Sequence, residues 1–362
     1  MTFAAAPLHH ARPDFATRVH GTIMGGALGD AFGYLVEFDS LADIVNTHGP
    51  SGLQDLAAAG SPVHFSDDTQ MTLYTLDGLL DVLEWANDGV GADINACQWL
   101  AYLRWLKTQK VPVPDHAPAQ PPRWIDAQTV LHHRRHPGNA CLSGLGTGEM
   151  GTVARPVNPD SKGCGTVMRS APYGLLPHVE AETVYKISSE AASLTHGHPA
   201  ARQSSGAFSW LIHQLVIGGL SLRAAAQSAQ ARAAAEPGAD PALLARLDAA
   251  LTLSANEPLS GDDLTEALGL GWVAEEAFAV ALYCVLVTES SAASPAEHFR
   301  TAVPLAANHS GDSDSTAALA GNLLGALYGE AALPAQWLAV VEAPELIRRL
   351  ADDFLTLTTG AA

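Results

Sequence analysis

Two stretches of the sequence, far apart along the chain, each place a pair of aspartates beside hydroxyl side chains. The first is FSDDTQMTL and the second is SGDSDSTAA. Their oxygen-bearing side chains are Ser66, Asp67, Asp68 and Thr69, then Asp312, Asp314, Ser315 and Thr316. Neighbouring carboxylates repel each other when both are ionised, and a bound divalent cation such as Mg²⁺ or Mn²⁺, which prefers oxygen ligands, relieves that repulsion. The two stretches therefore suggest one shared metal site, with room for two cations, if they meet in the fold.

Helix capping is the simpler explanation for either stretch alone, since Ser, Asp and Thr accept hydrogen bonds from the free amides at a helix start. An EF-hand loop beginning at Asp312 is excluded, because its sixth and twelfth positions would be Ala317 and Leu323 instead of Gly and Glu. The glycine-rich stretch MGGALGDAFG lacks the spacing of a phosphate-binding loop. Because two such stretches occur in one chain, a divalent-metal site is still favoured over helix capping alone.

The overall charge limits the partners. The chain has 362 residues, 38 acidic and 19 basic, and a formal charge of −19. This balance argues against nonspecific nucleic-acid binding and against an anionic membrane surface. The four cysteines are scattered without C-x-x-C spacing, which is typical of a reduced setting. MTFAAAPLHHARPDF lacks the pattern of a signal peptide, and AFAVALYCVLV is too short to span a bilayer. We expect a cytoplasmic protein without a membrane partner.

Helical spacing dominates the elements that must position these side chains. Leu73, Leu76, Leu80 and Leu83 recur every three or four residues after FSDDTQ, and runs typical of strands are scarce. The small residues of TAALAGNLLGALYG predict close contact of that helix with another, through Ala317, Gly321 and Gly325. The sequence therefore predicts an all-α fold in a single domain, 1–362. Residues 108–164, rich in Pro, Gly and His, are expected to form ordered loops that carry function.

Six stretches together resemble the ADP-ribosylglycohydrolase family, which includes the dinitrogenase reductase-activating glycohydrolases. They are GTIMGGALGDAFGYLVEF, FSDDTQMTL, GCGTVMRSAPYGL, SLTHGHPAA, GWVAEEAFAVALYC and NHSGDSDSTAALAGNLLGALYG. The resemblance implies a compact all-helical domain, an orthogonal bundle of many helices, with two Mg²⁺ or Mn²⁺ ions in a cleft. It also implies hydrolysis of the bond that joins ADP-ribose to a modified side chain or a related acceptor.

Carried over by motif position, the resemblance implies roles for particular residues. The metal ligands are Ser66, Asp67, Asp68, Asp312, Asp314 and Ser315, with Ser at both positions where many relatives have Thr. The residues assigned to catalysis are Glu37, Asp68 and Asp314, and the choice of general acid or base between Asp68 and Glu37 stays open. Without the resemblance, Glu37 would be taken as a solvated residue at a helix end. Asp30 is expected to be a structural partner of the site.

The resemblance also places substrate contacts in the glycine-rich loops, where backbone amides can approach a pyrophosphate closely. These contacts are Ser161, Gly163, Cys164, Gly165, Met168 and His196. Relatives usually carry Asn at the position of Cys164, so this chain departs from the family pattern at that side chain. We expect Arg169 to form a buried ion pair and His198 to be peripheral.

The expected reaction is metal-dependent release of ADP-ribose from an ADP-ribosylated protein or a related conjugate. Two other classes fit the same ligands: a two-metal phosphoesterase or pyrophosphatase, which would release AMP or phosphate, and a noncatalytic protein that binds ADP-ribose. The sequence leaves open the acceptor, the choice of Mg²⁺ or Mn²⁺, the residue that stacks on adenine, and the oligomeric state.

Overall fold

The computed structural model describes residues 13–360, and the N-terminal part of MTFAAAPLHHARPDF lies outside them. In the first half of the chain the helices are α1 Phe15–Gly33, α2 Leu41–His48, α3 Asp67–Asn87, α4 Ile94–Thr108, α5 Asn139–Gly146, α6 Ala181–Ala192 and α7 Pro199–Val216. In the second half they are α8 Leu222–Ala234, α9 Pro241–Leu253, α10 Gly261–Leu268, α11 Ala274–Thr288, α12 Pro295–Ala307, α13 Ser313–Tyr328, α14 Ala335–Leu338 and α15 Pro344–Thr359. Residues 13–360 form no strand, so the predicted all-α fold is confirmed.

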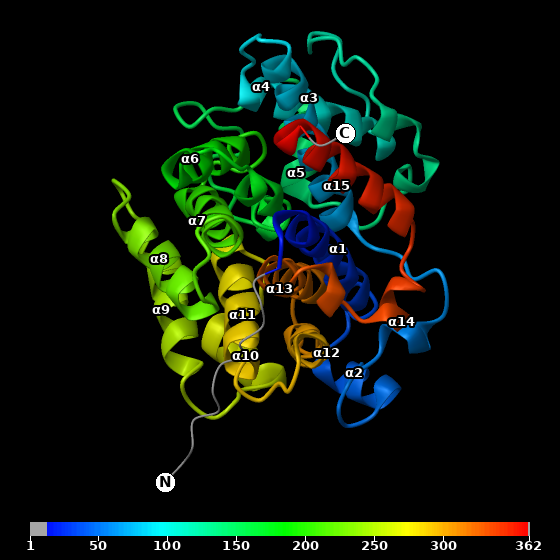
Figure 1. Cartoon of the computed structure of the whole chain (residues 1–362), viewed down its shortest axis with the longest axis vertical. Coiled ribbons are helices and arrows are strands. Elements are labelled where there is room, and N and C mark those ends of the chain that lie inside the picture. Colours follow the sequence, from blue (N-terminus) through cyan, green and yellow to red (C-terminus); the bar gives the residue numbers. More distant parts are fainter. Residues whose placement is uncertain (1–12, 361–362) are drawn as a thin grey trace.

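Helices α1 and α13 lie side by side at the centre of the molecule (Figure 1) and run antiparallel. A small residue stands at every fourth position of both contact faces. On α1 these are Gly21, Gly25, Gly29 and Gly33, and on α13 they are Ser313, Ala317, Gly321 and Gly325. A methyl group added to any of these α1 glycines would collide with backbone of the facing residues. The close helix contact predicted from Ala317, Gly321 and Gly325 is therefore confirmed.

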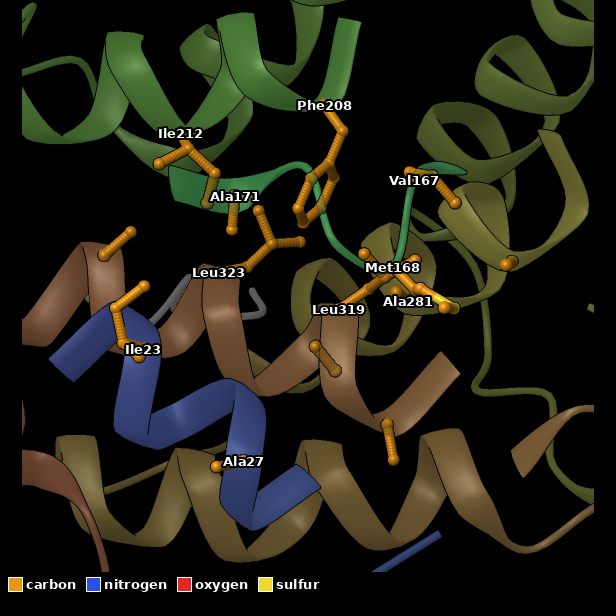
Figure 2. Packing of buried hydrophobic residues seen from close by; sticks show 14 of the residues in the cluster. Ile23, Ala27, Val167, Met168, Ala171, Phe208, Ile212, Ala281, Leu319 and Leu323 are labelled. Carbon is orange, nitrogen blue, oxygen red and sulfur yellow. The ribbon is translucent and has the colours of Figure 1, made fainter. Parts of the chain in front are cut away.

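Apolar side chains from several helices close over this central pair (Figure 2). Ile23 of α1 and Leu323 of α13 lie below Phe208 and Ile212 of α7, and all four side chains are buried. Helix α11 also packs against α13, and AFAVALYCVLV is buried throughout. Among residues 13–360, no helix combines the length and the apolar character that crossing a membrane requires.

Residues 108–164 are held against the helices by polar contacts. Asp77 of α3 is buried and forms ion pairs with Arg104 of α4 and with Arg123 of the segment, the second at 2.9 Å. The Asn158 side-chain amide donates to the carbonyl oxygens of Ala140 and Thr195 at 3.0 and 2.9 Å. These contacts fix the segment at both of its ends, and α5 forms within it.

Candidate active site

The two aspartate stretches meet at the starts of α3 and α13. The Ser315 hydroxyl donates a hydrogen bond to Asp68 Oδ1 at 2.9 Å, across 247 positions of sequence. Both stretches also cap their helices. Ser66 Oγ accepts from the Asp68 amide at 3.1 Å, and Asp312 Oδ1 accepts from the Ser315 amide at 3.4 Å. Capping and a shared site are therefore compatible readings of the same residues.

Asp30 of α1 ties the start of α3 to the central helix pair. Its fully buried carboxylate accepts from the amides of Ser66 and Thr69, each at 2.8 Å, and from the Thr69 hydroxyl. Burial and the nearby Asp314 raise its pKa to about 7. Asp30 is thus a structural partner of the site, as expected, and it sets the position of Asp67 and Asp68.

A cavity of about 760 Å³ opens where the two stretches meet. The side chains that the sequence assigned to metal binding or catalysis and that line it are Glu37, Asp67, Asp68, Asp312, Asp314 and Ser315. The expected substrate contacts Ser161, Gly163, Cys164, Gly165, Met168 and His196 line it as well. Ser66 is the exception, because its fully buried side chain caps α3 instead of lining the cavity.

The carboxylates in this cavity are crowded and buried. Burial, followed by the charge of Asp314, raises the pKa of Asp67, Asp68 and Asp312 well above the ordinary value. Burial also raises the pKa of Glu37 to about 10, with further contributions from Asp314, Asp312 and Asp67.

Glu37 itself is only 8% exposed, and its Oε2 atom has no hydrogen-bond partner in the described part of the chain. Glu37 is therefore not a solvated residue at a helix end.

The donor chemistry of the cavity fits a divalent cation. Several carboxylates and the Ser315 hydroxyl converge on it, and hard oxygen donors of this kind suit Mg²⁺ and Mn²⁺. The buried Glu37 Oε2, which lacks a partner, would gain one from a cation or a bound water. In their present arrangement, residues 13–360 contain no group of three or more His, Cys, Asp or Glu side chains that could hold a metal ion. The cavity therefore fits a divalent cation in the kind of donor atoms that it offers.

Cys164 and His196 join the glycine-rich loop to the rest of the cavity. The Cys164 thiol donates to Asp312 Oδ2 at 2.9 Å, so this side chain contacts the acidic cluster. The His196 ring lies against Gly163 and Gly165, where a methyl group on either glycine would be only 3.2 or 3.0 Å from it. Burial and the nearby Arg169 lower the pKa of His196 to about 3, so the imidazole is neutral at physiological pH.

The expected ion pair of Arg169 is wrong. Its buried guanidinium donates to Thr195 Oγ1 at 2.7 Å and lies 4.4 Å from the centre of the Tyr102 ring, and no salt bridge to it forms within residues 13–360. Thr195 Oγ1 is in turn 2.8 Å from His196 Nδ1. Because the Thr195 oxygen accepts from Arg169, its proton can be donated to His196 Nδ1, which leaves the imidazole proton on Nε2 beside Gly163. Arg169 therefore orients a cavity residue. His198, expected to be peripheral, caps α7.

Sequence reasoning missed eight further residues that line the cavity: Phe38, Arg134, His136, Pro137, Gly138, Asn139, Ala140 and Trp272. The Phe38 and Trp272 rings lie nearly parallel with centroids 6.4 Å apart, and His136 approaches Phe38 to 4.7 Å. The sequence contains features that could have pointed to two of them. Phe38 directly follows Glu37, and Arg134 belongs to the run HHRRH in an otherwise acidic chain. Either aromatic ring is a candidate for stacking on a base.

Comparisons with known proteins agree with the fold and the motifs. The family model described as ADP-ribosylglycohydrolase matches residues 11–362. The chain is 26% identical to the ADP-ribosyl-[dinitrogen reductase] glycohydrolase of Rhodospirillum rubrum, over 95% of this chain and 98% of that protein. It is 27% identical to the ADP-ribosylarginine hydrolase Tri1 of Pseudomonas putida (strain GB-1), over 93% of this chain and 77% of that protein.

A solved structure, described as an ADP-ribosylglycohydrolase-related protein complex, superposes with a TM-score of 0.61 at 21% identity and covers 95% of this chain and 99% of its own. At that identity the superposition supports the fold alone. The family model matches nearly the whole chain and therefore also assigns the family. This chain belongs to the ADP-ribosylglycohydrolase family.

Proposed function

We propose that this protein is a metal-dependent hydrolase that releases ADP-ribose from an ADP-ribosylated protein or a related conjugate. The observation that carries the proposal is the convergence of Asp67 and Asp68 with Asp312 and Asp314 on one cavity, beside Glu37. The relatives named above add support, because their names describe hydrolases of ADP-ribosylated dinitrogen reductase and ADP-ribosylarginine.

Two divalent cations, Mg²⁺ or Mn²⁺, would be held by Asp67, Asp68, Asp312 and Asp314, with hydroxyl oxygens from Ser66 and Ser315. Such cations lower the pKa of a bound water and stabilise negative charge on ligand oxygens. Of the two hydroxyls, Ser315 has the stronger support, because it lines the cavity and bonds to Asp68. Ser66 would have to turn away from its capping position to reach a cation.

The other roles follow from the chemistry of the lining residues. Ser161 and the backbone amides near Gly163 and Gly165 would hold the pyrophosphate, since glycine lets a phosphate approach the backbone. The neutral His196 would donate a hydrogen bond through Nε2 without adding charge. Met168 and the Cys164 side chain would complete the wall on this side of the cavity.

For the bond cleavage itself, Glu37, Asp68 and Asp314 are the proposed catalytic residues. A carboxyl group with a raised pKa can keep a proton near neutral pH and donate it to the departing acceptor. Glu37 is buried, lines the cavity beside the aspartates and has an oxygen without a partner in the described part of the chain, so we assign it this role. Asp68 and Asp314 would then stabilise the positive charge that develops on the ribose, and a water would bond to the ribose carbon as the acceptor leaves. Asp68 is the alternative acid, or the base that takes a proton from that water.

Product analysis tests the proposal. We expect the protein, supplied with Mg²⁺ or Mn²⁺, to release free ADP-ribose from an ADP-ribosylated protein, and Asp312→Ala to abolish that release while the far-UV circular dichroism stays helical. Asp88→Asn, beyond the end of α3, is the charge-matched control and should keep full activity. Release of AMP or phosphate would identify a phosphoesterase instead, and binding of ADP-ribose without turnover would identify a noncatalytic reader.

A further inference from the structure

The mouth of the cavity has an exposed apolar edge, formed by Phe38, Leu270 and Trp272. Phe38 is 62% exposed, Leu270 44% and Trp272 42%, and the Phe38 and Trp272 rings are nearly parallel. Leu270 stands two residues before Trp272, and its backbone lies beside the cavity, because its carbonyl accepts from the Asp312 amide at 2.8 Å. Single exposed apolar side chains are ordinary, but several of them around a polar cleft are typical of a binding surface.

The segments that carry this edge are strongly acidic. Residues 35–48 contain three acidic residues and no Lys or Arg, and residues 257–276 contain six acidic residues and again no Lys or Arg. Their exposed acids include Asp39, Asp43, Asp262, Asp263 and Glu266. We call these five residues the acidic flank.

Both halves of the acidic flank lie next to the cavity. The amide of Leu41, at the start of α2, donates to Ser310 Oγ at 2.7 Å, and the amide of Ser310 donates to Asp262 Oδ1 at 3.2 Å. Ser310 stands two residues before Asp312, which lines the cavity. The starts of α2 and α10 therefore meet beside the acidic centre, in the lower half of Figure 1.

A positive charge also lines the cavity, that of Arg134. His136 lines the cavity as well and contacts Phe38. Within residues 13–360 no salt bridge involves Arg134, although the protein as a whole is rich in carboxylates. The mouth is thus negative beside Leu270 and positive beside Arg134, and this asymmetry would give a docked chain one direction.

We infer that the apolar edge and the acidic flank together form a docking surface for the acceptor polypeptide, suited to a segment in which basic side chains adjoin apolar ones. The inference rests on the proposed function, since an acceptor bonded to ADP-ribose must leave the cavity through its mouth. Complementary charge selects the partner: Lys and Arg are attracted to the acidic flank, whereas the phosphates of a nucleic acid are repelled by it. The apolar edge provides area that such a segment can bury.

The test compares two ADP-ribosylated peptides that carry the same modified residue. One has Lys and Arg on both sides of it, and the other has Asp and Glu. In the double variant Asp39→Asn and Asp263→Asn we expect KM for the basic peptide to rise about fivefold at low salt, and the rise to shrink at high salt. Neither carboxylate makes a hydrogen bond in the described part of the chain, so removing the charges breaks no internal contact. Leu270→Ser should weaken binding of the basic peptide as well.

Two controls separate docking from general damage. The double variant should leave turnover of a small ADP-ribosyl conjugate without a peptide unchanged. A charge-matched double variant, Asp88→Asn and Asp115→Asn, should leave both peptides unaffected. These positions follow α3 and α4, are exposed, and do not line the cavity.

The inference is overturned if wild-type protein prefers the acidic peptide or a single-stranded oligonucleotide. It is also overturned if the double variant Asp39→Asn and Asp263→Asn affects both peptides equally, affects the small conjugate, or changes nothing. Binding of the labelled peptides is measured by fluorescence anisotropy beside turnover. If no substrate releases ADP-ribose, the proposed function fails, while the difference in binding between the two peptides still decides the docking surface.

Discussion

The backbones of Gly25 and Gly321 touch at the crossing of α1 and α13, because neither residue has a side chain. A methyl group on either one would collide with the carbonyl oxygen of the other. This contact matters for the site as well as for the core. Since the helices are antiparallel, close packing along their whole length brings the end of α1, before Glu37, to the start of α13, where Asp312 and Asp314 lie.

Gly25→Ala should therefore lower the free energy of unfolding by about 2–3 kcal/mol, the cost of overpacking a close helix contact. Denaturant unfolding followed by circular dichroism measures it. Gly91→Ala is the matched control, because its added methyl group would have no atom within 4 Å. Equal stability of the two variants would show that the helices can separate at no cost.

The second prediction concerns the effect of added metal ion on thermal stability. If the carboxylates hold Mn²⁺ or Mg²⁺, adding the ion should raise the midpoint of thermal unfolding, by an amount equivalent to about 2.7 kcal/mol at a hundredfold excess over Kd. Asp312→Asn removes a ligand charge and should abolish this rise, whereas Asp88→Asn should retain it. Isothermal titration calorimetry of the metal-free protein supplies an independent reading. No rise in any variant, with no heat of binding, would exclude the metal.

Glu37→Gln tests the assignment of the proton donor. The amide keeps the shape of the side chain but cannot transfer a proton, so kcat should fall about 100-fold or more, while KM changes little. An acceptor that is itself a good leaving group needs no proton from the enzyme, so its cleavage should be much less affected. A uniform loss of activity for good and poor leaving groups would move the role to Asp68.

His298 gives the pH dependence of stability. It is buried, its Nε2 lies 2.9 Å from the Val285 carbonyl oxygen and its Nδ1 lies 2.9 Å from the Tyr328 hydroxyl. Burial lowers its pKa to about 4, from 6.5 in the unfolded chain. The unfolded state therefore binds a proton more readily, and stability should fall as the pH drops from 6.5 to 4, by about 3 kcal/mol for this group.

His298→Gln removes that titration, so the difference between wild type and variant should shrink over the same pH range. Urea unfolding at several pH values measures it. The exposed His48, replaced by Gln, serves as control and should leave the pH profile unchanged. A variant with the same pH profile as wild type would mean that His298 has the same pKa in the native and the unfolded state.

How much of the site was predictable depended on whether a residue's role is set by its neighbours in sequence or by packing. The aspartate stretches were visible because their charges stand beside hydroxyls and at helix starts, and local spacing predicted both. Phe38 and Trp272 come together only through tertiary packing, so no local pattern pairs them. The partners of Arg169 could not be predicted either, because a buried guanidinium can be satisfied by a hydroxyl and an aromatic face as well as by a carboxylate.

The last prediction concerns the loop that carries Arg134 and His136. Between them, the buried Arg135 forms an ion pair with Glu342 and donates at 2.8 Å to the carbonyl of Phe65, the first residue of the first aspartate stretch. Farther along the same loop, the Gly138 amide donates to Asp67 Oδ2 at 3.3 Å. Arg135 thus positions one wall of the cavity relative to Asp67.

Arg135→Met should raise KM and lower stability by about 3 kcal/mol, because it leaves the buried Glu342 carboxylate with only the half-exposed His64 ring, 2.9 Å away, as a partner. Adding Glu342→Met removes that stranded charge and should restore most of the stability, since an apolar pair can replace a buried ion pair at little cost. KM should stay raised in the double variant, because the contact with the Phe65 carbonyl is still missing. If stability and KM both returned to wild-type values in the double variant, the Arg135–Glu342 ion pair would act through stability alone and would not position the cavity wall.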